Sequence, residues 1–212
     1  MWRLNPQLTA CISSGRVILL DELRDRYFAV PTAAAQAVLD WLDANDGGIP
    51  PAALTKVLGE LGRDGLSNQD RTRVQIPQPA ASQPEGESVP VAAILSVASA
   101  VAVTWLGLRA RRLSTILKER RLARGAHPAL DAAQLSRRAR AFSAARRWCP
   151  IPPNCLLDSL AFDRWMRSPG GVQLVFGVVG QPFEAHCWVQ SDREILNDSY
   201  DRVSRFEPIL SI

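Results

Sequence analysis

The first 66 residues alternate between short apolar segments and turn residues. Three apolar segments with turns between them predict a small antiparallel meander. These segments are Leu8–Ile12, Arg16–Leu20 and Arg26–Val30. Two later stretches predict helices, one from Pro31 to about Ala44 and one after Pro51. The apolar residues of the second stretch recur with helical spacing and are Leu54, Val57, Leu58 and Leu61. Three strands with short helices predict a winged-helix-like module over residues 1–66.

Residues 67–90 interrupt this pattern. They contain four prolines and many Ser, Gln and Glu side chains, but few large apolar ones. Such a segment cannot bury a core and is typical of a flexible or partly extended linker. We therefore expect an N-terminal domain over residues 1–66, a Pro-rich linker over 67–90 and a second domain over 91–212.

Residues 91–108 form an uncharged, mainly apolar run that is followed directly by RARR. Its length and the basic flank fit a membrane span. Ala, Val and Ser dominate the run, which also fits a buried helix that packs closely against its neighbours. The serine and threonine residues favour the buried helix, and the membrane span remains an alternative.

The rest of the chain predicts helices followed by strands. Residues 109–147 are expected to be helical, with an interruption around Gly125–Pro128. Since no proline separates Leu108 from Arg109, we expect the apolar helix to continue into this basic one. The later elements are a helix from Cys155 to about Met166 and strands at Val172–Val179, Phe183–Gln190 and Glu194–Asp198. This order predicts an α+β fold.

Positive charge is concentrated in one segment. The chain carries a net charge of +4, yet residues 109–147 alone hold twelve basic and two acidic side chains. Such an excess predicts a surface for nucleic acid, an acidic peptide or an acidic membrane, or else a solvated helix face.

Four cysteines at irregular spacing do not predict a disulfide scaffold in a chain of 212 residues. They are Cys11, Cys149, Cys155 and Cys187. The first ten residues lack the apolar core of a signal peptide. We therefore expect a cytoplasmic protein with reduced thiols, in which a cysteine is catalytic, metal-binding or buried.

Cys155 lies where reactive thiols are often found. It follows Pro152, Pro153 and Asn154, and Asn154 is a good N-cap residue. Cys155 would then be the first residue of a helix, where the helix dipole and exposed N–H groups stabilise a thiolate.

His186 and Asp198 complete a candidate catalytic group. If residues 191–193 form a three-residue hairpin loop, Gln190 pairs with Glu194 and His186 lies opposite Asp198. Cross-strand neighbours are about 5 Å apart, close enough for a carboxylate to orient an imidazole. A thiol, an imidazole and a carboxylate form the nucleophile, base and orienting group of thiol acyl transfer.

A zinc site is the alternative use of the same residues. Its ligands would be Cys149, Cys155, His186 and Cys187. The spacing between the first two cysteines is looser than in ordinary zinc sites, and the adjacent His186 and Cys187 point to opposite faces of a strand. We expect no metal and no cofactor.

Three motifs surround the candidate group, and they follow one another in the chain. They are Cys155-Leu156-x-x-Ser159-Leu160, LVFGVVGQPFEAHCWVQ at Leu174–Gln190, and ILND at Ile195–Asp198. Together they resemble the leader peptidases of lasso-peptide biosynthesis, whose catalytic part is a transglutaminase-like, papain-like cysteine protease domain. The resemblance implies that Cys155 is the nucleophile, His186 the base and Asp198 the orienting residue. Two positions depart from the family, Cys187 where alanine is frequent and Gln190 where an acidic residue is common.

The N-terminal unit resembles the precursor-peptide recognition element of pathways for ribosomally made peptides. The resemblance rests on Gly15, Val17–Asp21, Arg26–Val30 and the helix that follows. In that family, the leader peptide adds as a strand beside the third strand and against the last helix. The implied leader-binding residues are Arg26, Tyr27, Phe28, Ala29, Val30, Leu54, Val57, Leu58 and Leu61.

The resemblance also implies two partners, a lasso precursor peptide and an asparagine-synthetase-like cyclase that closes the macrolactam ring. A nucleic-acid-binding regulator is the alternative function, with a winged helix and a basic segment. The helix over residues 51–61 argues against it, because Lys56 and Glu60 are its only charges and base readout needs more donors. A membrane-anchored protein is a further alternative, as is an enzyme that passes its acyl group to an amine.

Overall fold

The computed structural model describes residues 7–44, 49–55, 74–77, 90–124, 127–167 and 169–212. The chain forms two compact units. The first contains the N-terminal strands together with Gly177–Ala185 and Phe206–Leu210, and the second contains Val74–Phe176, His186–Arg205 and Ser211–Ile212. The domain division at residues 67–90 stays a prediction, since only residues 74–77 and 90 of that linker lie within the described part of the chain.

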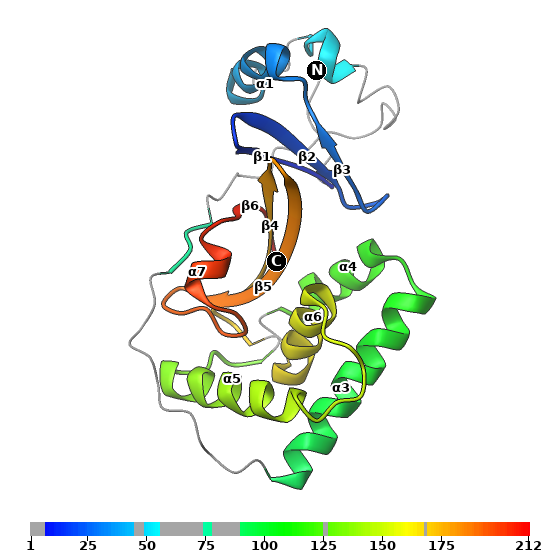
Figure 1. The fold of residues 1–212 in the computed structure, drawn as a ribbon, viewed down its shortest axis with the longest axis vertical. Helices are drawn as coiled ribbons and strands as arrows, with labels where there is room; N and C mark the ends of the chain where they lie inside the picture. The colour runs from blue at the N-terminus through cyan, green and yellow to red at the C-terminus, as the bar shows by residue number, and fades with distance from the viewer. Residues whose placement is uncertain (1–6, 45–48, 56–73, 78–89, 125–126, 168) are drawn as a thin grey trace. The chain divides into compact units, whose positions relative to one another are not determined.

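The first unit begins with the expected meander (Figure 1). Strands β1 (Leu8–Ser13), β2 (Arg16–Asp21) and β3 (Arg26–Ala29) pair antiparallel in the order β1-β2-β3. The turn between β1 and β2 consists of Ser14 and Gly15, with φ of 52° and 70°. A two-residue turn with positive φ at both positions matches the right-handed twist of the paired strands. β3 is at the end of the strand order, so it is an edge strand of this sheet.

Helix α1 (Thr32–Ala44) covers the core of this unit. The core residues are Val17, Leu19, Val30, Ala35, Val38 and Leu54. Residues 52–55 are helical, as the apolar spacing predicts. The other three apolar positions of that helix, Val57, Leu58 and Leu61, lie outside the described residues.

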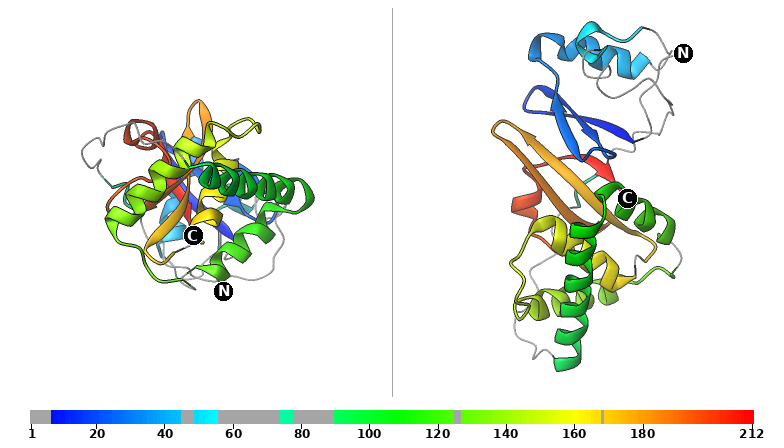
Figure 2. Two further views of the ribbon diagram at one scale, coloured as in Figure 1. Left: turned by 90° about the horizontal axis from the view of Figure 1, so that it is seen from below. Right: turned by 90° about the vertical axis from the view of Figure 1, so that its right-hand side faces the viewer.

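The second unit is built around packed helices, and Figure 2 shows two further views of them. Helix α3 (Val91–Ala110) packs against α4 (Leu113–Ala123), α5 (Ala132–Arg146) and α6 (Cys155–Met166). The expectation that the apolar helix continues into the basic segment is wrong. α3 ends at Ala110, and Arg111 is extended, with φ −138° and ψ 153°. The break allows α4 to change direction and bury its own Ile116 and Leu117.

One side of α3 is buried and the other is not. Val97, Val101 and Thr104 are buried, whereas Leu95 and Leu106 are 63% and 58% exposed. Among the described residues, α3 is the one helix long and apolar enough to cross a membrane, and 22% of its apolar window is buried. The buried-helix interpretation therefore holds for one face of α3 only.

The sheet of the C-terminal part confirms two of its three expected strands. β4 (Val172–Gly180) lies between β5 (Phe183–Ser191) and β6 (Glu207–Ser211). The expected strand at Glu194–Asp198 is wrong, because this segment forms only an isolated bridge between Gln190 and Ile195. β6 supplies the third strand and follows the short helix α7 (Tyr200–Val203).

Several arginines of the basic segment are used inside the protein. Asp163 on α6 has a fully buried side chain, and its carboxylate lies 3.1 Å from Arg124 Nη1 and 3.8 Å from Arg120 Nη1. The same Arg124 nitrogen donates a hydrogen bond to the carbonyl oxygen of Val172 at 2.7 Å. These contacts hold α4 against α6 and β4. The solvated-face interpretation of the basic segment is therefore wrong for Arg120 and Arg124.

Replacing Asp163 tests this clamp. Asp163→Ala leaves two guanidinium groups with little solvent contact and without their carboxylate, so we expect a loss of about 3 kcal/mol in the free energy of unfolding, measured by urea denaturation. Asp192→Ala, in an exposed loop, is the matched control and should change the free energy by less than about 0.5 kcal/mol. Equal stability of the two variants would contradict the clamp.

Candidate active site

Cys155 is the first residue of α6, as expected from the sequence. The preceding Asn154 has extended backbone geometry, and its Oδ1 accepts hydrogen bonds from the N–H groups of Leu156 at 3.1 Å and Leu157 at 3.2 Å. The asparagine cap therefore starts the helix at the cysteine. It places the half-buried thiol at the positive end of the helix dipole.

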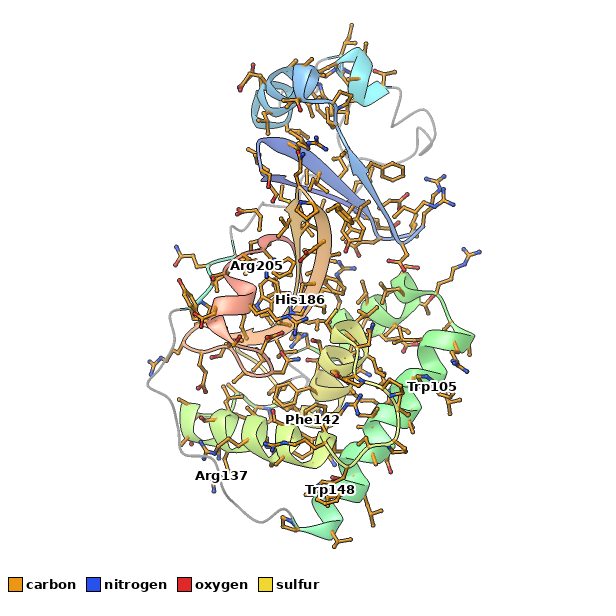
Figure 3. The ribbon with its side chains drawn as sticks, viewed as in Figure 1. Trp105, Arg137, Phe142, Trp148, His186 and Arg205 are labelled. Carbon is orange, nitrogen blue, oxygen red and sulfur yellow. The ribbon has the colours of Figure 1, made fainter. Side chains whose placement is uncertain are left out.

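His186 lies on β5 (Figure 3). It contacts both other members of the candidate group. Its Nε2 is 2.6 Å from Oδ2 of Asp198. The imidazole is also hydrogen-bonded to the Cys155 thiol, and Nδ1 is the ring nitrogen that remains for this bond. Only 3% of His186 is exposed, and its ring stacks on Trp188 with 6.1 Å between ring centroids. The structure thus brings the three predicted residues together in the order thiol, imidazole, carboxylate.

The electrostatics of the thiol favour its ionised form. The hydrogen bond to His186 lowers the pKa of Cys155 below its ordinary value of 9.0, against the opposing effect of burial. Hydrogen bonds from the backbone N–H groups of Cys187 and Leu156 lower this pKa further. All these donors stabilise negative charge on sulfur.

Burial and hydrogen bonding also have opposing effects on the pKa values of His186 and Asp198. Burial opposes the charged imidazole, yet its hydrogen bonds to Asp198 and Cys155 outweigh burial and raise the pKa of His186 to about 9. Burial likewise opposes charge on Asp198, but hydrogen bonds from His186 and the Ser199 N–H lower the pKa of this carboxyl group. These shifts favour a thiolate–imidazolium pair held by a carboxylate.

The contact between His186 and Asp198 does not arise from the expected strand register. The bridge pairs Gln190 with Ile195, one residue further along than the three-residue loop predicts. Beyond it, Leu196 N–H donates to the Val189 carbonyl oxygen, but the next ladder bond is made by a side chain, since Oδ1 of Asn197 accepts from the Val189 N–H at 2.7 Å. The side chain replaces the backbone as the acceptor. The segment therefore leaves the strand path and carries Asp198 to the imidazole.

Ser159 and Asn197 form a brace that sequence reasoning did not assign. The fully buried Ser159, one turn after Cys155, donates from Oγ to the carbonyl oxygen of Cys187 at 2.9 Å. Asn197 Nδ2 donates to the same Ser159 oxygen at 2.8 Å. These bonds join α6, β5 and the Asp198 segment. Ser159 lies in the Cys-Leu-x-x-Ser motif and Asn197 in the ILND motif, and these positions were the sequence signal for a role at the site.

A second chain of contacts extends from His186 to the segment after the N-terminal unit. Trp188, on which the imidazole stacks, donates from Nε1 to Oε1 of Gln190 at 2.7 Å. Gln190 is 2% exposed and donates from Nε2 to the carbonyl oxygen of Gln75 at 2.8 Å. Gln75 belongs to the expected linker, so the part of that linker that the structure describes is hydrogen-bonded to β5.

The predicted leader-binding residues fall into three groups. Arg26 and Ala29 of β3 are exposed, and Tyr27 and Phe28 are half-buried. Val30 and Leu54 lie in the core of the first unit, with 1% and 0% exposure. The remaining predicted residues, Val57, Leu58 and Leu61, lie outside the described part of the chain.

Metal ligation was the competing use of the cysteines. Among the described residues, no group of three or more His, Cys, Asp or Glu side chains is placed to hold a metal ion. All four cysteines are free thiols. Burial raises the pKa of Cys187 well above its ordinary value, and burial also raises the pKa of Cys11 to about 12. The pKa of Cys155 is thus lowered, whereas those of these two thiols are raised.

Comparison with known protein families gives a match over residues 94–211, to a family described as Transglutaminase-like superfamily. This range begins within α3, ends in β6 and contains Cys155, His186 and Asp198. It spans more than half of the chain. No curated protein and no solved structure matches the sequence.

The pH dependence of Cys155 alkylation tests the ion pair. We expect iodoacetamide to reach half of its maximal rate at Cys155 below pH 9.0, because the hydrogen bond to His186 lowers the thiol pKa. In His186→Ala, this midpoint should rise, since the stabilising imidazole is lost. Peptide mass mapping gives the rate at each pH. His127→Ala, which changes the other histidine of the chain, should leave the midpoint unchanged, and equal profiles for both variants would refute the ion pair.

The brace generates a separate prediction. Ser159→Ala and Asn197→Ala each leave buried polar groups unpaired, so each should lower the free energy of unfolding by about 1–3 kcal/mol. Each should also raise the pH midpoint of Cys155 alkylation, because α6 and β5 are then held less closely. Ser143→Ala on the exposed side of α5 is the control. A loss of stability without a shifted midpoint would leave Ser159 and Asn197 with a structural role only.

Proposed function

The chain belongs to the transglutaminase-like superfamily, and we propose that it is a cysteine peptidase that cleaves the leader from a lasso-peptide precursor. The observation that carries the proposal is the linked arrangement of Cys155, His186 and Asp198, with 2.6 Å between the imidazole and the carboxylate. The lowered pKa of the thiol and the raised pKa of the imidazole are what thiol acyl transfer requires.

In the first step, the Cys155 thiolate attacks the carbonyl carbon of the bond between leader and core. A C–S bond forms, and the carbonyl oxygen takes up the negative charge. The backbone N–H of Cys155, at the start of α6, is the proposed donor to this oxyanion. When the intermediate collapses, the C–N bond breaks and the His186 imidazolium protonates the leaving amine. The core peptide departs with a free amino terminus, and the leader remains bound as a thioester.

In the second step, water releases the leader. The neutral His186 accepts a proton from water while the oxygen attacks the thioester carbon. The C–S bond then breaks, so the leader leaves as a carboxylic acid and Cys155 returns as a thiolate beside the imidazolium. Asp198 orients the imidazole through both steps and stabilises its charged form.

We further propose that the leader binds along the edge of β3. The edge position of this strand supports pairing of its backbone with an added peptide strand. Arg26 and Ala29 are exposed there, and the half-buried Tyr27 and Phe28 lie between them. Val30 and Leu54 contribute from the core, by supporting the strand. Joining this edge to the peptidase in one chain raises the effective concentration of the scissile bond.

The proposal assigns two partners and no cofactor. The precursor peptide is the substrate, and the released core passes to an asparagine-synthetase-like cyclase that closes the macrolactam. The reaction takes place in the cytoplasm. Each chemical step uses only the side chains of this chain and one water molecule.

Intact-mass analysis of a precursor peptide incubated with the full-length protein tests the proposal. We expect cleavage at one leader–core junction by the wild type and at least about a thousandfold slower cleavage by Cys155→Ala, since the nucleophile is lost. Cys149→Ala, which changes another partly exposed thiol, is the matched control and should cleave normally.

Two results would contradict the proposal. Cleavage by Cys155→Ala at the rate of the wild type would exclude this nucleophile. A product in which the leader is joined to an added amine rather than released as an acid would make the protein an acyltransferase instead of a peptidase.

A further inference from the structure

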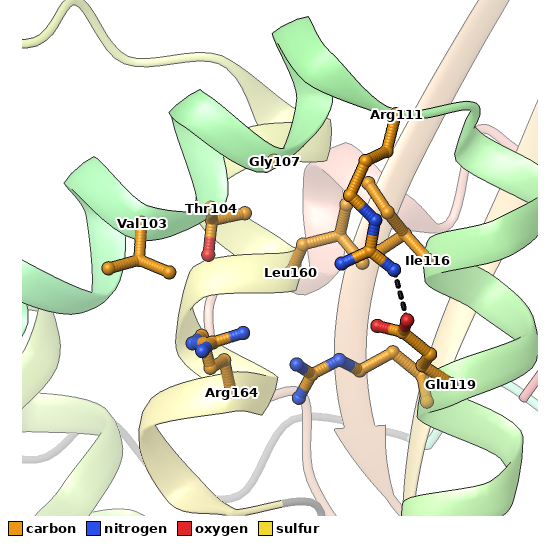
Figure 4. Close-up of a pocket in the computed structure, with 9 residues that line it drawn as sticks. Val103, Thr104, Gly107, Arg111, Ile116, Glu119, Leu160 and Arg164 are labelled. Atoms are coloured by element: carbon orange, nitrogen blue, oxygen red, sulfur yellow. Dashed lines mark hydrogen bonds and ion pairs between the residues drawn. The ribbon is translucent and has the colours of Figure 1, made fainter.

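A hollow of about 190 Å³ lies in the second unit, between α3, α4 and α6 (Figure 4). None of the residues Cys155, His186 and Asp198 lines it. Its polar lining consists of Thr104, Arg111, Glu119, Arg120 and Arg164. The hollow is smaller than the roughly 300 Å³ at which pockets for drug-sized ligands begin. An occupant would therefore be a small group.

Positive charge exceeds negative charge around this hollow. Arg111 pairs with Glu119, as the dashed line in Figure 4 shows. Arg120 is 3.8 Å from Asp163, a carboxylate that it shares with Arg124. Among the described residues, no carboxylate lies within ion-pair distance of Arg164. Of the described residues that line the hollow, three carry a guanidinium group and one carries a carboxylate.

Arg111, Glu119 and Arg164 are exposed to solvent, whereas the side chain of Arg120 is largely buried. Burial lowers the pKa of Arg120. The carboxylates of Asp163 and Glu119 oppose this effect, and the positive charges of Arg164 and Arg124 add to it. Arg120 therefore lies in a partly buried place where neighbouring cations repel its charge, and an anion in the hollow would stabilise it.

We propose that this hollow binds a phosphate group, either as free phosphate or as part of a small phosphate ester. Guanidinium groups from the end of α3, from α4 and from α6 line the hollow, and a tetrahedral dianion offers oxygen atoms to all three. Its charge balances the excess of two positive charges. A carboxylate carries one charge and two oxygens in a plane, so it satisfies this site less well. The site is independent of the proposed peptidase activity.

Isothermal titration calorimetry of the full-length protein at constant ionic strength tests the site. Inorganic phosphate and glycerol 2-phosphate are the probes, and acetate is the carboxylate reference. We expect saturable binding of at least one phosphate probe with a stoichiometry of one, and weaker binding of acetate. Tighter binding of glycerol 2-phosphate assigns the site to an ester, and tighter binding of inorganic phosphate assigns it to the free anion.

Three variants separate this site from general attraction to a basic protein. Arg164→Gln removes one charged donor and should weaken phosphate binding about tenfold. Glu119→Gln removes the carboxylate that competes for Arg111 and should strengthen binding. Arg137→Gln, an equal change of charge on the exposed side of α5, should leave the affinity unchanged.

Arg164→Gln is expected to weaken phosphate binding and Glu119→Gln to strengthen it. Poor folding of a variant can explain weaker binding but not tighter binding, so the proposal remains falsifiable. Absence of saturable binding of both phosphate probes to the wild type would overturn the proposal. Equal affinities in the wild type, Arg164→Gln and Glu119→Gln would also overturn it, since these side chains would then take no part in binding. An equal loss of affinity in Arg137→Gln and Arg164→Gln would overturn it too, since binding would then reflect net charge alone.

Discussion

The hydroxyl group of Ser159 is the point on which the geometry of the candidate active site depends. It donates to the backbone beside His186 and accepts from the side chain beside Asp198. Ser159 itself is on α6, one turn after Cys155. A single fully buried atom thus joins the three segments that carry the thiol, the imidazole and the carboxylate. Since an unmade buried hydrogen bond costs about 1–3 kcal/mol, the packing of these segments and their chemistry are coupled.

Burial and pairing compete at two places in the second unit. At the candidate active site, burial opposes charge on Cys155, His186 and Asp198, and the hydrogen bonds between them outweigh that effect on each pKa. Around Asp163, the fully buried carboxylate is held by two arginines. Both places need partners from different elements, so both form only when the helices and the sheet have packed. The excess of arginine over carboxylate near Arg164 is the part of this second network that remains unbalanced.

Much of the local structure can be predicted from the sequence. The asparagine cap before Cys155, the two strands β4 and β5 and the first meander all follow from short-range patterns of apolar, capping and turn residues. The sequence also predicts that His186 meets Asp198, although the register used to reach that contact is one residue off. The contact forms all the same because Asn197 replaces a backbone acceptor with its own amide oxygen and redirects the chain.

Patterns of neighbouring residues were enough to predict most helices and strands and to identify Cys155, His186 and Asp198 as a candidate catalytic group. They could not define the break after Ala110, the choice of residues 207–211 as the third strand, or the brace of Ser159 and Asn197. These features depend on contacts with residues far away in the chain, such as the hydrogen bond from Ser159 to the carbonyl oxygen of Cys187. A polar side chain carries no local sign of whether it will face water or such a partner. Folding settles that choice, because a buried polar group must find a hydrogen bond within the packed protein.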